Sequence, residues 1–328
     1  MRFRGNPASI RGSIAPVVTP FRPDGALDLD GLRGLVRWQL AVGSHGISIG
    51  GSTGEPSAQS VAERIEAMRV VADEVADRVP FLPGTGSAKL DETMQLTAAA
   101  ADLGADAVLV ITPYYARPTQ QGLYNWFAMV AAEFPQLPIV IYNVPSRTAV
   151  EVAPETVARL RRDHDNIVGI KETTKDFEHF SRVIHACGRD LLVWSGIELL
   201  CLPLLALGGT GFVSATANIA PAAVAQMYEY WMAGDHEKAR DLHYRLHPLV
   251  DLLFVETNPA PAKWVLAQLG RLASDHVRPP LVPVTDAALP RIRALLAEGA
   301  ELAGSPDAER SGAAAAVTSP AAARPVAS

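Results

Sequence analysis

The sequence predicts an α/β fold, a (β/α)8 TIM barrel with a C-terminal helical extension. Short β-branched segments alternate strictly with longer amphipathic segments, and this alternation repeats eight times between residues 13 and 233. Parallel strands need crossover helices and cover on both faces, so eight such units favour a barrel. A doubly wound sheet is the alternative, but the first turn, IAPVVTPFRPDG, lacks the glycine pattern G-x-G-x-x-G that is typical of it.

The expected strands are short runs rich in valine, isoleucine and other apolar residues. The segments between them, such as 61–79 and 91–104, carry apolar residues at three- and four-residue spacing, which indicates amphipathic helices. Glycine or proline near the ends of these segments is typical of helix termini. The eight expected strands are 14–18, 46–50, 81–83, 106–111, 138–142, 167–171, 191–194 and 210–214.

The chain outside the eight units divides into three parts. Residues 1–12 form an N-terminal segment, and residues 234–300 contain three helical patterns that make up the C-terminal extension. The last part, 301–328, is rich in alanine, proline and serine and cannot bury enough side chain to offset the entropy of ordering. We expect a disordered tail there. The three helical patterns are 235–256, 259–270 and 286–298.

Composition narrows the class of protein. Of 328 residues, 48% are hydrophobic and 20% are charged, which is ordinary for a soluble globular protein, and the net charge of −6 disfavours nucleic acid as a partner. The most apolar stretch, LLCLPLLALGG from Leu199, is too short to span a membrane, and the basic N-terminus lacks the apolar region of a signal peptide. The two cysteines, Cys187 and Cys201, do not encode a disulfide framework. We expect a cytoplasmic protein.

Polar residues gather where the expected strands end. In a (β/α)8 barrel this end forms the catalytic face. We expect the following hydroxyls, phenols, amides and cations to converge there: Thr19, Ser52, Thr53, Thr85, Thr112, Tyr114, Tyr115, Tyr142, Asn143, Arg147, Lys171, Ser195, Gly196 and Ser214.

Lys171 ends the apolar run NIVGIK and is the strongest candidate for chemistry. A lysine at a strand end can also extend to solvent or pair with its neighbour Glu172. Period-two alternation, however, directs Lys171 inward and Glu172 outward, toward the rim or the start of a helix. Apolar surroundings disfavour the charged ammonium, so the free amine becomes available to attack a carbonyl. Tyr142, at the same height one strand earlier, can transfer protons in that reaction, or it can simply pack with its hydroxyl bonded.

The turn GGSTGE, residues 50–55, is a candidate carboxylate site. Its glycines permit close backbone approach, and its amides together with the hydroxyls of Ser52 and Thr53 suit an anion, although many such turns are only turns. It lacks the lysine of a P-loop. His243 and His247 are four residues apart, but no H-E-x-x-H motif surrounds them and no histidine ends a strand. We therefore expect neither a metal nor another cofactor.

Six motifs in register resemble one known family. GGSTGE, TPYYARPTQQGLYNWF, IYNVPSRTA, IVGIKETTKD, SATANI and NPAPAKW occur in the order and spacing of the dihydrodipicolinate synthase and N-acetylneuraminate lyase family, from about residue 12 to about residue 300. The resemblance implies a (β/α)8 barrel with a C-terminal helical extension. It also implies a metal-free class I enzyme that forms a Schiff base with pyruvate.

The resemblance also implies roles for individual residues. Lys171 would form the imine with pyruvate, and Tyr142 would move protons at the same carbon. Thr53 and nearby amides would hold the carboxylate of pyruvate. Ser52 and Tyr115 would complete a proton relay with Tyr142, with Tyr115 reaching in from the neighbouring subunit of a homodimer or homotetramer. Other residues implied to bind substrate are Gly51, Gly196 and Val213.

Arg147 favours one branch of the family. In PSRTA it resembles the arginine with which the synthases bind the carboxylate of aspartate semialdehyde, whereas sialic acid lyases usually lack it. The expected reaction is thus the condensation of pyruvate with aspartate semialdehyde in lysine and diaminopimelate biosynthesis. The alternative is a lyase or dehydratase acting on a sugar acid or hydroxy-keto acid, of the N-acetylneuraminate or 2-keto-3-deoxy acid type. A non-catalytic pyruvate-binding relative ranks last, because it would be expected to have lost the lysine.

Three features depart from the synthase pattern. Ser52 stands where the synthases usually have threonine, and GSTGE is more typical of the lyases. SGIE, at 195–198, stands where SGDD is common, beside the second substrate. Val61, Arg64 and Ala88 occupy the positions that match the lysine-binding residues of feedback-inhibited synthases. We therefore expect that millimolar lysine does not slow the enzyme.

Overall fold

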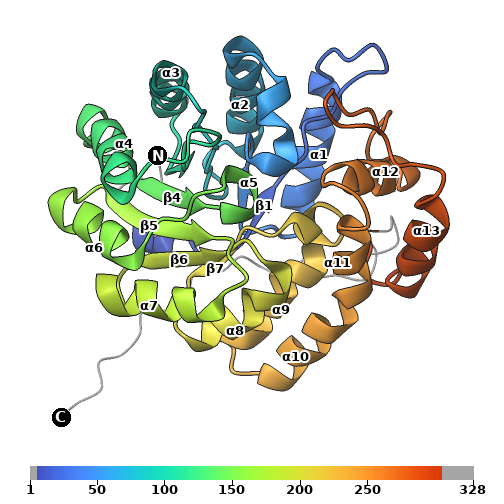
Figure 1. The fold of residues 1–328 in the computed structure, drawn as a ribbon. Helices are drawn as coiled ribbons and strands as arrows, with labels where there is room; N and C mark the ends of the chain where they lie inside the picture. The colour runs from blue at the N-terminus through green and yellow to red at the C-terminus, as the bar shows by residue number, and fades with distance from the viewer. Residues whose placement is uncertain (1–5, 305–328) are drawn as a thin grey trace.

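Seven parallel strands with flanking helices form the body of the protein (Figure 1). The computed structural model describes residues 6–304, so nearly all of the tail expected at 301–328 lies outside the described residues. The described strands are β1 (Gly12–Pro16), β2 (Gly46–Ser48), β3 (Val108–Ile111), β4 (Ile139–Asn143), β5 (Ile167–Glu172), β6 (Leu192–Ser195) and β7 (Gly211–Phe212).

The strands follow the order β2-β1-β7-β6-β5-β4-β3, and every neighbouring pair is parallel. The strand expected at 81–83 is not a regular strand but two isolated parallel bridges, Phe81 to Ile47 and Gly84 to Leu109. Pro83 and the preceding Pro80 explain the difference, because proline has no backbone N–H to donate to a ladder. The segment still bonds on both sides: the amide of Leu82 donates to Ile47, and that of Leu109 donates to Pro83, both at 2.9 Å.

Helices lie between consecutive strands, as expected. Ser60 and Glu63 form a capping box that starts α2, and α2 ends earlier than expected because Ala76 and Asp77 adopt positive φ. The described helices are α1 (Leu29–Ala41), α2 (Val61–Val75), α3 (Leu90–Asp102), α4 (Gln120–Glu133), α5 (Pro145–Thr148), α6 (Pro154–Asp163), α7 (Phe177–Cys187), α8 (Cys201–Ala206), α9 (Pro221–Met232), α10 (His236–Arg245), α11 (His247–Leu253), α12 (Ala260–Gln268) and α13 (Leu289–Glu298).

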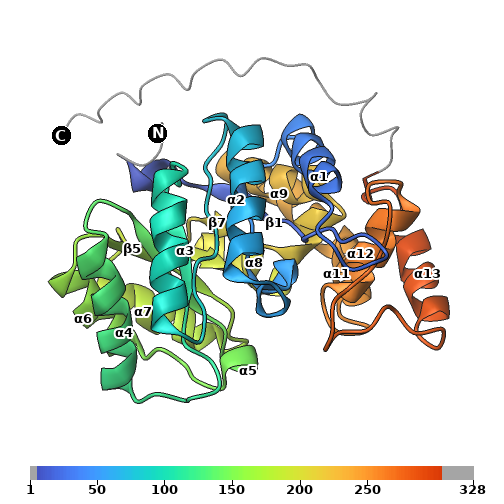
Figure 2. The same cartoon turned by 90° about the horizontal axis from the view of Figure 1, so that it is seen from above.

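The C-terminal helices gather on one side of the molecule, where α11, α12 and α13 lie together (Figure 2). The single helix expected at 235–256 is divided into α10 and α11. Pro248, in the first turn of α11, has no N–H with which to continue the preceding helix, which explains the division.

Two apolar clusters stabilise this arrangement. The larger one joins strands to helices through residues such as Leu35, Val71 and Phe127. The smaller one, which includes Val140 and Trp194, consists of side chains from the strands or directly beside their ends and from segment 81–85, with Ile10 ahead of β1. Alternate side chains along each strand therefore point into two different buried clusters, one on each face of the sheet. Within residues 6–304, no helix is long and apolar enough to cross a membrane.

Candidate active site

Lys171 and Tyr142 lie side by side at the ends of neighbouring strands. The register of β4 and β5 pairs Tyr142 with Lys171 directly, at the same height, as the sequence predicts. Both side chains are buried, with 5% of Lys171 and 4% of Tyr142 exposed. Nζ of Lys171 lies 4.1 Å from the centre of the Tyr142 ring. The amine is thus inside the protein and beside a phenol.

Gly196 makes room for the lysine. A Cβ atom at this position would lie 2.7 Å from Cε of Lys171, which is closer than real Cβ contacts allow. The amide of Gly196 donates to the carbonyl of Glu172 at 2.8 Å, which fixes the turn after β6 against β5. A side chain at this position would therefore force Lys171 and Thr173 to shift.

Ser52 contacts the hydroxyl of the phenol. It lies in the short 3-10 helix Ser52–Gly54, and its Oγ is 3.1 Å from the hydroxyl of Tyr142. Burial acts to raise the pKa of Tyr142, but the charge of Lys171, the hydrogen bond with Ser52 and the charge of Arg147 outweigh it, so the pKa of Tyr142 is lowered. A lowered pKa suits a group that gives and takes protons.

Thr53 is held by a residue to which the sequence assigned no role. Nδ2 of Asn258 donates to Oγ1 of Thr53 at 3.0 Å, and the backbone carbonyl of Asn258 accepts a longer bond, 3.4 Å, from Arg147. Asn258 lies in the motif NPAPAKW and is buried. Because Thr53 accepts this bond through a lone pair and does not use its proton for it, the hydroxyl proton of Thr53 remains available for a ligand oxygen.

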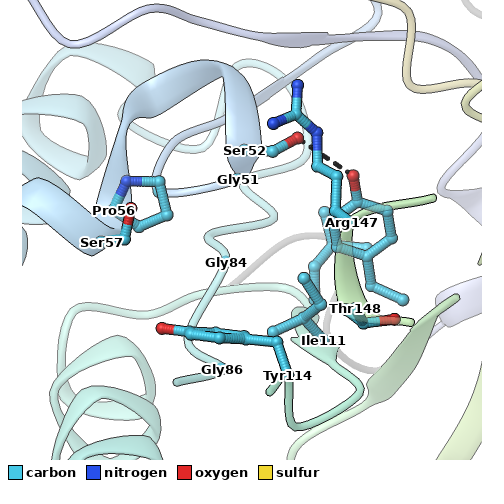
Figure 3. A pocket seen from close by; sticks show the side chains of 13 residues that line it. Gly51, Ser52, Pro56, Ser57, Gly84, Gly86, Ile111, Tyr114, Arg147 and Thr148 are labelled. Carbon is cyan, nitrogen blue, oxygen red and sulfur yellow. Dashed lines mark hydrogen bonds between the residues drawn. The ribbon is translucent and has the colours of Figure 1, made fainter. Parts of the chain in front are cut away.

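A cavity of about 220 Å³ opens beside these residues (Figure 3). Ser52 and Arg147 lie at one end, and Tyr114 with Gly86 lies at the other. Lys171 is not among the lining residues. The cavity is lined by Gly50, Gly51, Ser52, Pro56, Ser57, Gly84, Gly86, Leu109, Ile111, Tyr114, Tyr142, Arg147 and Thr148.

Tyr115 and Val213 are not brought into this cavity. Tyr115 is 96% exposed and has a φ of 74°, so its side chain leaves the site of its own chain. Val213 is buried in the smaller apolar cluster, and its amide donates to the carbonyl of Ser195 at 2.8 Å. Thr53, Gly196 and Lys171 do not line the cavity either, but Lys171 lies against the ring of the lining residue Tyr142 and Gly196 packs against Lys171.

The end of the GGSTGE turn is anchored by a buried ion pair. Nζ of Lys263, on α12, lies 2.5 Å from Oε1 of Glu55, and both side chains are at most 1% exposed. The amide of Arg278 donates to the other carboxylate oxygen at 2.9 Å. Burial lowers the pKa of Lys263 to about 8 against the opposing charge of Glu55. The C-terminal extension therefore holds the turn that carries Ser52 and Thr53.

Two further buried carboxyl groups stand near the strand ends. Glu172 is not an exposed charge on the rim but lies against the start of α7, the other position expected from alternation: it pairs with His179 at 3.2 Å and accepts from Asn143 at 2.9 Å. Glu198, in SGIE, accepts from the amide of Ala215 at 2.7 Å. Burial raises the pKa of both carboxyl groups. The side chain of Glu172 follows β5 outward but is covered by α7, which the strand pattern alone did not indicate.

Residues 6–304 contain no group of three or more histidine, cysteine or acidic side chains that could hold a metal ion. The rings of His243 and His247 do approach each other, with centres 5.2 Å apart, near the junction of α10 and α11. Two imidazoles without a third ligand provide an incomplete set for zinc.

Comparison with known proteins gives a consistent match over nearly all of the described residues. The model of the dihydrodipicolinate synthetase family matches residues 9–299. A 4-hydroxy-tetrahydrodipicolinate synthase of Thermus thermophilus is 49% identical over 283 residues, which cover 86% of this chain and 94% of the relative.

Solved structures agree with the sequence relatives. The 4-hydroxy-tetrahydrodipicolinate synthase of Methylacidiphilum fumariolicum SolV superimposes with a TM-score of 0.86 at 37% identity, covering 89% of this chain and 96% of that one. The dihydrodipicolinate synthase of Acinetobacter baumannii, solved in complex with pyruvate, gives a TM-score of 0.85 at 38% identity, covering 89% and 99%.

Proposed function

The chain belongs to the dihydrodipicolinate synthetase family, a family of enzymes, and we propose that it is a 4-hydroxy-tetrahydrodipicolinate synthase. Its substrates would be pyruvate and aspartate semialdehyde, and the reaction would belong to lysine and diaminopimelate biosynthesis. The relatives of this name at 49% identity support the choice. The Acinetobacter relative, whose solved structure contains pyruvate, supports the first substrate.

The pairing of Lys171 with Tyr142 is the observation that carries the proposal. The amine of Lys171 attacks the ketone carbon of pyruvate, and loss of water forms an imine. Tyr142, whose ring centre is 4.1 Å from that amine and whose hydroxyl is bonded to Ser52, supplies and removes the protons that these steps require. The imine then loses a methyl proton to become an enamine, whose carbon adds to the aldehyde. The amine is released when the product cyclises.

The carboxylates of the two substrates would bind at separate groups. Thr53, whose hydroxyl proton is available, together with the amide of Gly51, would hold the carboxylate of pyruvate. The exposed guanidinium of Arg147, at the end of the cavity that contains Ser52, would bind the carboxylate of the semialdehyde in a bidentate pair. Gly196 would leave the space that the imine needs beside Lys171.

Tyr115 would act in a neighbouring subunit. A tyrosine that is 96% exposed on a strained backbone is poorly explained in a single chain, and it follows directly after Tyr114, which lines the cavity. We include in the proposal a homodimer or homotetramer in which Tyr115 completes the relay of its partner. Val213 would contribute only through its packing in the smaller apolar cluster.

The proposal includes a closed eight-unit barrel with a C-terminal helical extension. Segment 81–85 would be the eighth unit, since it bonds to Ile47 of β2 on one side and Leu109 of β3 on the other. Residues 13–233 would form the barrel and 234–300 the extension. A cytoplasmic location fits the two free cysteines and the substrates.

The function is tested by a substrate panel. Purified protein supplied with pyruvate should consume aspartate semialdehyde. The rate is measured in a coupled assay with a reductase that uses the product. N-acetylneuraminate and 2-keto-3-deoxy acids, offered in the cleavage direction, should release pyruvate far more slowly. The opposite ranking would favour the lyase or dehydratase function, which Ser52 and the SGIE segment would then support.

A further inference from the structure

Arg64 is a buried cation that the proposed mechanism does not use. It lies in the first turn of α2 and is only 6% exposed. Its Nη2 donates to the carbonyls of Gly84 at 3.0 Å and Gly86 at 3.1 Å, and its Nε has no hydrogen-bond partner. In residues 6–304 no carboxylate forms an ion pair with it. Burying a charge in this way costs several kcal/mol, and such perturbed charged groups cluster at functional sites.

The acidic residues nearby are committed to other partners. Glu63 pairs with Arg278 at 2.6 Å. Glu92 accepts from Ser87 at 2.6 Å and pairs with Lys89 at 3.0 Å. Burial lowers the pKa of Arg64 to about 10, against opposing interactions with Tyr114 and Glu92, so the guanidinium is still charged at neutral pH. Its positive charge is therefore not cancelled by a direct partner.

The two carbonyls that Arg64 binds belong to the wall of the cavity. Gly84 and Gly86 both line it and follow Gly51 along the same wall (Figure 3). The wall is tightly fitted: a Cβ atom on Gly84 would lie 2.7 Å from the carbonyl oxygen of Gly50. A Cβ atom on Gly50 would in turn lie 3.9 Å from Nη2 of Arg64. The guanidinium thus stands one layer of backbone behind the cavity.

This position gives Arg64 two effects on a bound anion. By binding two carbonyl oxygens, the guanidinium neutralises partial negative charges that would otherwise repel a carboxylate in the cavity. Its own charge acts through protein of low effective dielectric rather than through water, so it is weakly screened. Arg147 supplies a cation at the exposed end of the cavity, and Arg64 supplies one behind the inner wall.

We propose that Arg64 is a specificity-determining residue that acts through the wall formed by Gly84 and Gly86 and favours anionic over neutral carbonyl substrates. This inference rests on the proposed function, because it requires pyruvate to form an imine with Lys171. Arg64 does not touch the substrate. It positions the wall and sets the electrostatic potential of the cavity.

The test compares pyruvate with hydroxyacetone, a neutral ketone of similar size. Each is trapped on Lys171 with borohydride over a range of concentrations, and the ratio of the two trapping efficiencies is measured. Arg64→Met should lower the ratio of the trapping efficiency for pyruvate to that for hydroxyacetone about tenfold. This is the order expected when one nearby charge is removed from surroundings with an effective dielectric constant of about 20. Arg64→Lys retains the charge and should keep the ratio within about twofold.

Arg69→Met is the matched control, because Arg69 is an exposed arginine on the same helix, and it should leave the ratio unchanged. If Arg64→Met does not fold, Arg64→Gln makes the same comparison with an amide that can still donate to a carbonyl. Equal losses for both ketones, an unchanged ratio, or the same fall of the ratio in Arg64→Lys would each overturn the inference. Failure of the wild-type protein to trap pyruvate on Lys171 would instead overturn the proposed function.

Discussion

Two lysines of this chain are buried against an aromatic ring, one at the end of β5 and one in α12. Nζ of Lys171 lies 4.1 Å from the ring centre of Tyr142, and Nζ of Lys263 lies 4.1 Å from that of Phe21. Lys263 pairs with Glu55 at 2.5 Å. In residues 6–304 no ion pair includes Lys171.

The difference separates a structural lysine from the proposed nucleophile. Burial is almost the same at the two sites, so burial alone does not identify a nucleophile. In Lys263 the carboxylate of Glu55 opposes the pKa-lowering effect of burial and holds the amine in an ion pair, so that amine is not free to attack a carbonyl. Lys171 instead lies beside the phenol of Tyr142. Because that phenol is hydrogen-bonded to Ser52, a proton from the amine could pass through the phenol to the serine. The partner of each lysine, rather than its depth, determines its role.

The largest effect is expected at Lys171. Lys171→Met should lower the condensation rate by at least about 10³-fold, because no imine can form. The thermal midpoint should stay unchanged or rise, since the variant removes a buried amine that has no ion-pair partner. The coupled assay and a melting curve measure both. An activity within about tenfold of the wild type would show that Lys171 is not the nucleophile.

Lys263→Met should act mainly on stability. The carboxylate of Glu55 would remain buried without its partner, at a cost of about 3–5 kcal/mol in the free energy of unfolding, measured by urea titration. Glu55→Gln combined with Lys263→Met should recover part of that loss, because it removes the unpaired charge. A double variant as unstable as the sum of its single variants would contradict the direct pairing.

Arg147→Ala should separate the two substrates. The loss of a charge-assisted bond to the semialdehyde should lower kcat/KM for that substrate about 30-fold. Imine formation with pyruvate, followed by borohydride trapping, should change little, because Lys171 and Thr53 remain in place. Equal losses in the two measurements would remove the role assigned to Arg147.

The smallest effect concerns the pKa of Tyr142. A hydrogen bond from Ser52 stabilises the phenolate and therefore lowers this pKa, so Ser52→Ala should move the titration of Tyr142 to higher pH. Ultraviolet difference spectra follow the phenolate, and Tyr142→Phe identifies its contribution. A shift to lower pH in Ser52→Ala would mean that the serine does not stabilise the phenolate.

The sequence could predict the half of the site that depends on strands. Period-two alternation and the order of the units are enough to place Lys171 inward and Tyr142 beside it at the same height, and the register of β4 and β5 agrees. The same reasoning failed for segment 81–83, where prolines interrupt the ladder. For Glu172 it left open the rim and the start of a helix, because the pairing with His179 of α7 is not visible in the strand pattern.

The other half of the site depends on contacts between distant parts of the chain. Asn258 lies 205 residues after Thr53, and Glu55 meets Lys263 only because α12 docks beside the GGSTGE turn. No local pattern encodes such docking. The available signal was the presence of the polar residues Asn258 and Lys263 in the otherwise apolar motif NPAPAKW.

The comparison of the two lysines is tested most directly by mapping the imine. The wild-type protein is treated with pyruvate and borohydride and digested, and the masses of its peptides are measured by mass spectrometry. We predict one reduced pyruvate adduct, on Lys171, and none on Lys263. An adduct on Lys263, or no adduct on Lys171, would contradict the account.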